Sequence, residues 1–205
     1  MFRKIIFLLT LFLSTSALFA NSLIHHRISV KVDPARHYLE AVDQITIPSA
    51  QVKPLIYFLI NSNLNVTSET PAVTLKLDKS GVKAADVGMD QEDFKLSSEI
   101  TQNKYALTFE GEIKGDVSFT LKFSGTIHYP IKQMGEEYAR GFSQTPGIID
   151  EKGVYLAGST YWVPRFDDEL ISFELTAIVP ESWSVVSQGK RTLDDVKDGF
   201  RFIRW

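Results

Sequence analysis

The sequence predicts an all-β domain, either an antiparallel β-sandwich or a curved open sheet, on three observations. Apolar and polar residues alternate in several short stretches, most clearly over residues 171–179 and 117–123. A period of two is typical of strands with one buried face. Clusters of Gly, Pro and Asn separate these stretches, as turns separate strands. No stretch after residue 20 has the apolar period of an ordinary helix, so we expect strands throughout.

A hairpin is expected at the start of the domain. Ile28, Val30 and Val32 alternate with polar residues, residues 33–36 (Asp-Pro-Ala-Arg) have turn composition, and residues 39–47 repeat the alternation. This is the pattern of two paired strands. Residues 55–60 follow as a short, continuously apolar run, which predicts a strand buried on both faces.

The middle of the chain predicts two more strands joined by a tight turn. Residues 105–109 and 117–123 alternate, and Gly115-Asp116 stands between them, which favours a hairpin. Gly125 suggests a β-bulge soon afterwards. Residues 78–93 are polar, and we expect a loop there.

Residues 130–152 contain two prolines and three glycines, and they predict a long loop across one end of the sheet. Such loops are often functional. The alternation over residues 171–179 then predicts a half-buried antiparallel strand. Phe200 and Phe202 indicate a last short strand, and because the chain stops within it at Trp205, we expect the C-terminal edge of the domain to be cut.

Residues 1–20 have the pattern of a secretory signal peptide. Arg3 and Lys4 precede an apolar run, and small residues lead to Ala20. The run is short for a membrane span, although a retained N-terminal anchor is the alternative. We therefore expect a secreted or periplasmic domain over residues 21–205, without a membrane span after cleavage.

Composition excludes several kinds of site. There are no cysteines, which excludes disulfides, thiolate nucleophiles and cysteine metal sites. The formal net charge is −3, and cleavage after residue 20 would remove two further positive charges, so nothing predicts nucleic-acid binding.

The four histidines do not form a recognised catalytic pattern. They are His25, His26, His37 and His128, and none belongs to a His-Glu-x-x-His sequence. We therefore expect no metal ligand and no catalytic residue in this chain. Since successive strand residues face opposite ways, one side chain of the His25–His26 pair should be buried and the other more exposed to solvent.

Residues 161–166 (Tyr-Trp-Val-Pro-Arg-Phe) form an aromatic corner with two interpretations. Exposed aromatic clusters bind sugars or peptide side chains. The interpretation that we favour is a buried corner that fixes the preceding loop against the sheet.

Several segments in order resemble one family. Residues 26–48 resemble the opening hairpin of the aminopeptidase N family of zinc peptidases (peptidase family M1). Residues 147–149, 153–156 and 162–164 resemble the crossing of the N-terminal domain in divergent bacterial members, and residues 171–189 resemble the strand-Pro-turn-strand that follows. The resemblance covers almost all of the chain after residue 20.

The resemblance implies a saddle-shaped, non-catalytic β domain that flanks a thermolysin-like catalytic domain. The zinc ligands of the family lie downstream of the matched region, so zinc is implied only for a longer parent, whose substrate would be a peptide. In the family one loop of the β domain holds the substrate's amino group with a Gln- and Glu-containing segment. Residues 156–162 (LAGSTYW) occupy this place without either residue, which leaves Ser159 and Tyr161 as candidate substrate-binding residues.

A second hypothesis is a stand-alone periplasmic β-sandwich that binds a peptide, a carbohydrate or a partner protein. Its binding surface would be the aromatic corner together with residues 130–152.

Overall fold

The structure is a computed structural model that describes residues 23–83, 100–111, 113–137, 140–166 and 170–205; for 133–144 it describes the backbone alone. The predicted signal peptide and residues 84–93 of the predicted loop lie outside these ranges. Within them the chain consists of β-strands and short 3-10 turns, so the all-β prediction is confirmed. The described residues contain no helix with the length and hydropathy to cross a bilayer.

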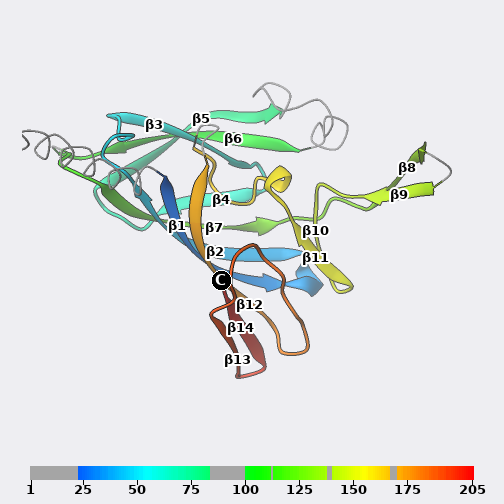
Figure 1. Ribbon diagram of the computed structural model, residues 1–205. Helices are drawn as coiled ribbons and strands as arrows, with labels where there is room; N and C mark the ends of the chain where they lie inside the picture. The colour runs from blue at the N-terminus through cyan, green and yellow to red at the C-terminus, as the bar shows by residue number, and fades with distance from the viewer. Residues whose placement is uncertain (1–22, 84–99, 112, 138–139, 167–169) are drawn as a thin grey trace, which may run out of the picture.

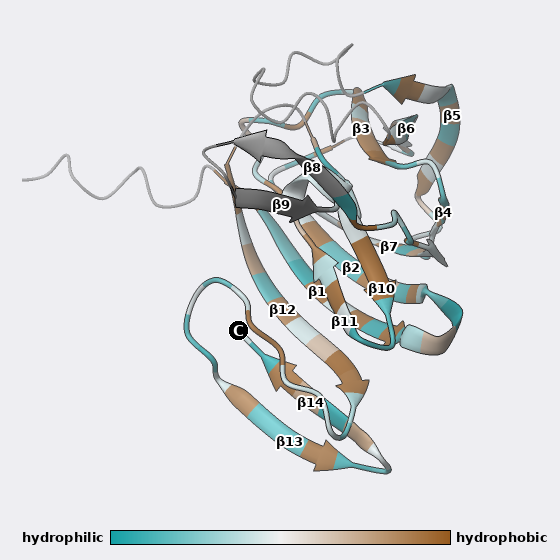
Figure 2. Cartoon of the chain, turned by 90° about the vertical axis from the view of Figure 1, so that its right-hand side faces the viewer, coloured by the Kyte–Doolittle hydropathy of each residue, from teal (hydrophilic) through white to brown (hydrophobic). Residues whose placement is uncertain are grey.

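The larger sheet has seven strands in the order β13-β14-β12-β1-β2-β7-β4 (Figure 1). These strands are β1 (Ile24–Asp33), β2 (Tyr38–Ile47), β4 (Leu64–Ser68), β7 (Val117–Thr126), β12 (Ile171–Pro180), β13 (Leu193–Lys197) and β14 (Phe200–Arg204). Apolar and polar residues alternate along β1, β2 and β12 (Figure 2). The predicted opening hairpin is confirmed, because β1 and β2 pair antiparallel around the 3-10 turn Pro34–Arg36.

A three-stranded sheet and two hairpins complete the fold. The small sheet has the order β3-β6-β5, with β3 (Leu55–Asn61), β5 (Val73–Lys83) and β6 (Thr101–Phe109). One hairpin joins β8 (Lys132–Glu137) to β9 (Arg140–Gln144) and extends away from both sheets (Figure 1). The other joins β10 (Gly147–Asp150) to β11 (Gly153–Leu156).

The two sheets enclose one apolar core. Phe58 and Leu107 of the small sheet belong to the same buried cluster as Phe119 and Ile45 of the large sheet. Phe166 lies between them, with its ring centroid 5.4 Å from that of Phe58 and 6.3 Å from that of Phe119. The aromatic corner is therefore built into the contact between the sheets.

The predicted hairpin between residues 105–109 and 117–123 is wrong. β6 pairs with β3 and β5, whereas β7 pairs with β2 and β4. Both segments are strands, but the chain crosses from the small sheet to the large one between them. Alternation identifies the face that a strand buries, but it does not specify which other strand it pairs with.

The long loop predicted for residues 130–152 is also wrong, because these residues form the β8–β9 hairpin and strand β10. The start of the predicted 78–93 loop continues β5 to Lys83. No register shift occurs at Gly125, where a bulge was expected. A Cβ atom there would lie 2.0 Å from the Asn63 carbonyl oxygen, so glycine permits a close backbone approach.

Two strands differ from their predicted environment. β3 is not buried on both faces, since Leu55 is 42% and Tyr57 36% exposed. β12 is a strand, as predicted, but it pairs parallel with β1 and antiparallel with β14. The prediction for the histidine pair is confirmed: His26 is fully buried and His25 is half-buried.

Candidate functional site

The two candidate substrate-binding residues lie at a tight turn after β11. Gly158–Thr160 is a 3-10 turn, and Tyr161 follows it in the left-handed conformation, with φ 54°. Ser159 is half-buried, whereas Tyr161 is 2% exposed and packs with Ile100 and Tyr129. The structure therefore places the half-buried Ser159 in the middle of the turn and the Tyr161 ring inside the domain.

Backbone hydrogen bonds hold the aromatic corner against β3. The N–H of Leu59 donates to the Arg165 carbonyl oxygen, and the N–H of Arg165 donates to that of Leu59, both at 2.9 Å. The N–H of Asn61 donates to the Tyr161 carbonyl oxygen at 2.7 Å. Tyr161, Pro164 and Phe166 are buried. The buried-corner interpretation is confirmed.

Asn61 stabilises the Gly158–Tyr161 turn through hydrogen bonds. Its side chain is fully buried, and Nδ2 donates to the Thr160 carbonyl oxygen at 2.9 Å and to the Tyr129 hydroxyl at 3.0 Å. Oδ1 accepts the N–H of Asn63 at 3.0 Å. Burial raises the pKa of Tyr129 above its usual 10.0, while the hydrogen bond with Asn61 acts in the opposite direction. The turn is therefore fixed by a connected polar network.

A cavity of about 390 Å³ lies beside the same corner. Ile47, Leu55, Tyr57 and Phe166 supply apolar lining, and Lys53 supplies a basic group at its wall. A concave apolar site with a few polar groups is the usual form of a small binding pocket.

His26 and Asp43 form a polar pair inside the apolar core. His26 Nδ1 lies 2.7 Å from Asp43 Oδ2, and neither side chain is exposed. Neither His26 Nε2 nor Asp43 Oδ1 has a hydrogen-bond partner. The pair joins β1 to β2, and its depth in the core favours a structural role.

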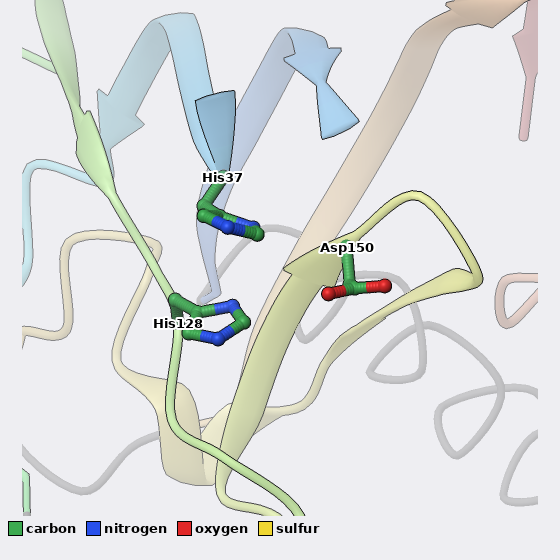
Figure 3. A group of neighbouring side chains, drawn as sticks. All are labelled: His37, His128 and Asp150. Carbon is green, nitrogen blue, oxygen red and sulfur yellow. The ribbon is translucent and has the colours of Figure 1, made fainter. Parts of the chain in front are cut away.

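A third polar group unites residues that the sequence does not relate. His37, His128 and Asp150 come from the β1–β2 turn, the segment after β7 and the end of β10 (Figure 3). One ligand atom from each lies within 4.8 Å of the others. Sequence reasoning did not predict that His37 and His128 would lie close together. Finding this group required knowledge that β2 pairs with β7. That pairing puts Tyr38 opposite Thr126 and so brings His37 and His128, which lie close to these residues in sequence, to the same end of the sheet.

This chain is similar to known proteins in structure but not detectably in sequence. The sequence matches no family profile and no curated protein. The M1 zinc metallopeptidase from Deinococcus radiodurans superposes with a TM-score of 0.51 and 15% identity, over 90% of this chain and 38% of that one. A mutant of the same enzyme gives a TM-score of 0.52 at 16% identity. A mutant bound to a Tyr-Ser-Ala substrate gives 0.51 at 15% identity, again over 90% and 38%.

The chain has the fold of part of an M1 zinc metallopeptidase. It spans 38% of the length of the first structures that it matches. The expected resemblance is confirmed at the level of fold, and the remaining 62% or so of the M1 chains has no counterpart in these residues.

Proposed function

We propose that this chain is the N-terminal β domain of an exported zinc metallo-aminopeptidase-like protein, and that it flanks the peptide-binding site of a thermolysin-like catalytic domain. The observation that carries the proposal is the coverage: 90% of this chain superposes on 38% of an M1 zinc metallopeptidase. In this proposal residues 1–20 are a signal peptide, which directs the protein to the periplasm or outside the cell.

The exposed edge of the large sheet supports a further domain beside this one. β13 is an edge strand, and every residue in it is exposed. Leu193 and Val196 on it are 38% and 42% exposed. An edge with unpaired backbone groups and apolar side chains favours association with another structural element.

The catalytic zinc of such a protein does not fit this chain. The sequence lacks His-Glu-x-x-His, and His37, His128 and Asp150 lie on a turn, an extended segment and a strand end instead of a helix. These residues therefore take no part in the proposed hydrolysis, which belongs to a separate catalytic domain.

Within this proposal the Gly158–Tyr161 turn contributes to substrate binding. Ser159 is half-buried and is the residue that we propose to contact the peptide. The Tyr161 ring is buried, so we propose that Tyr161 positions the turn through its packing with Ile100 and its backbone bond to Asn61. Burial of the aromatic corner also removes much of the surface that a stand-alone binding module would need.

Hydrolysis of aminoacyl anilides tests the proposal. We expect the purified 205-residue chain to be inactive, and a protein that includes its downstream coding sequence to be active and inhibited by chelators. Chelator-sensitive cleavage by the 205-residue chain, or a zinc-free and inactive longer protein, would contradict the proposal.

Ser159→Ala, made in the longer protein, tests the substrate contact. Loss of one hydrogen bond worth about 0.5–1.5 kcal/mol predicts a two- to roughly tenfold higher KM. Ser187→Ala is the matched control, because Ser187 is also half-buried and follows β12. Equal KM values in all three proteins would exclude the proposed role of Ser159.

A further inference from the structure

The group formed by His37, His128 and Asp150 has the composition of a transition-metal site. Within the described ranges it is the only group of three or more His, Cys, Asp or Glu residues with ligand atoms this close together. Two imidazoles and a carboxylate are ligands that Zn²⁺ accepts, and imidazole also suits Cu²⁺ and Ni²⁺. Both rings extend toward the side on which Asp150 lies (Figure 3).

One carbonyl oxygen orients both imidazoles. His37 Nδ1 lies 2.6 Å from the Ile149 carbonyl oxygen, and His128 Nδ1 lies 3.4 Å from the same atom. A carbonyl oxygen only accepts hydrogen bonds, so a neutral ring bound to it carries its proton on Nδ1 and keeps a lone pair on Nε2. Histidines that bind metals usually donate their second ring N–H in this way.

The backbone holds the three ligands in a fixed frame. The N–H of Ile127 donates to the His37 carbonyl oxygen, and the N–H of Ile149 donates to the Ile127 carbonyl oxygen, both at 2.9 Å. The two bonds link His37 to Ile127, which precedes His128, and Ile127 to Ile149, which precedes Asp150. Asp150 Oδ1 also accepts the N–H of Lys152 at 3.0 Å, which fixes the carboxylate at the start of the β10–β11 turn.

His37 adopts a conformation that favours this arrangement. Its φ is 54°, in the left-handed region, and this places it at the C-cap of the Pro34–Arg36 turn. Non-glycine residues in this region are uncommon, and local strain of this kind occurs often at functional sites. The turn directs the His37 ring at the end of β10, where its centroid lies 3.9 Å from that of His128.

We propose that His37, His128 and Asp150 bind one divalent transition-metal ion, with Zn²⁺ as the best match. Zn–N and Zn–O bonds of about 2.0–2.2 Å in a tetrahedron place ligand atoms about 3.3 Å apart. In the structure the ligand atoms lie within 4.8 Å of one another, so the side chains must move closer together to bind the ion. A fourth ligand, such as water, would complete the tetrahedron. The bound ion would tie the β10–β11 hairpin to the β1–β2 turn and to the end of β7, and this proposal does not depend on the peptidase function.

Metal titration of the 205-residue chain tests the site directly. Metal-free protein is titrated with Zn²⁺ in competition with a chromophoric chelator, and with Co²⁺ to record the visible bands of tetrahedral coordination. We expect one equivalent to bind. His128→Gln and Asp150→Asn should each weaken binding by about tenfold or more, since even the loss of a residue that orients a metal ligand costs 10- to 100-fold.

His37→Asn is a third ligand variant, chosen because asparagine tolerates the left-handed conformation. His25→Gln is the matched control: His25 is half-buried and its Nδ1 is hydrogen-bonded to Ser172 Oγ at 3.0 Å, outside the group. It should bind Zn²⁺ as the wild type does. Urea midpoints of the metal-free variants confirm that each one folds.

A structural measurement separates the site from adventitious binding. Zn²⁺ should slow hydrogen exchange at the amides of Ile127 and Ile149 in the wild type, and Asp150→Asn should need a correspondingly higher Zn²⁺ concentration for the same effect. No stoichiometric binding, equal affinity in the three ligand variants and the wild type, or unchanged exchange at these amides would overturn the proposal.

Discussion

His26 and Asp43 lie 2.7 Å apart on neighbouring strands, and both side chains are completely buried. The pair occupies the face that otherwise carries the apolar residues Ile28, Ala41 and Ile45. Each side chain is the hydrogen-bond partner of the other at zero exposure, so each makes the burial of the other tolerable.

Removing one member of this pair should destabilise the domain strongly. His26→Leu and Asp43→Val should each lower the free energy of unfolding by about 3–5 kcal/mol, because each leaves a buried polar group without its partner. The double variant should cost clearly less than the sum, since it leaves no orphaned group. Urea unfolding of the four proteins measures the difference, and additive losses would show that the two side chains do not act as a pair.

Gly125 should not tolerate a side chain. A Cβ atom at this position would lie 2.0 Å from the Asn63 carbonyl oxygen and 3.2 Å from Leu64 Cα, so the backbone must move. Gly125→Ala should cost about 1–3 kcal/mol of stability, as overpacking does. Gly153→Ala is the control, because a Cβ atom there meets nothing within 4 Å. Similar unfolding midpoints for the two variants would refute the close approach.

Asn61 should control the rigidity of the Gly158–Tyr161 turn. Asn61→Ala removes the donors to the Thr160 carbonyl oxygen and the Tyr129 hydroxyl, which should cost about 1–3 kcal/mol. The amides of Thr160 and Tyr161 should exchange faster with solvent. Asn65→Ala, on β4 at an exposed position, should leave both amides unchanged. Unaltered exchange in Asn61→Ala would mean that the turn is held by its backbone bonds alone.

Tyr129 should make the domain sensitive to alkaline pH. Its pKa is raised by burial above 10.0, so above pH 10 the folded state keeps a proton that the unfolded state has released. Stability is therefore complete below about pH 10 and falls as pH rises through the folded pKa. Tyr129→Phe should flatten this fall, whereas Tyr155→Phe, at a 53% exposed position, should not. Urea midpoints between pH 9 and 11 make the comparison, and parallel curves for the wild type and Tyr129→Phe would contradict it.

The sequence predicted strands well and their partners poorly. The alternation at Ile28, Val30 and Val32 placed β1 correctly, and the Asp-Pro turn after it specified an adjacent antiparallel partner. The turn residues Gly115-Asp116 between β6 and β7 gave a similar local signal, but the hairpin that it predicted is absent because the chain changes sheets there. β12 was likewise recognised by its period, but its parallel pairing with β1 depends on a long-range contact.

The candidate site was predicted only in part for the same reason. The aromatic corner at residues 161–166 follows from local composition, whereas the loop at residues 156–162 was implied only by the resemblance to the M1 family. The Tyr161 ring is buried and its backbone is left-handed, and local sequence does not predict the left-handed backbone. His37, His128 and Asp150 meet because β2, β7 and β10 come together at one end of the fold, and periodicity alone contains no information on that meeting.

The most direct test of the proposed function is to read the coding sequence beyond codon 205 in the same frame. The account predicts His-Glu-x-x-His followed by a further Glu, because the M1 fold over 90% of this chain would then be continued by the zinc-binding domain. A stop codon followed by unrelated sequence would contradict the account and would leave a free β domain, whose ligand would then be sought at the cavity beside Phe166.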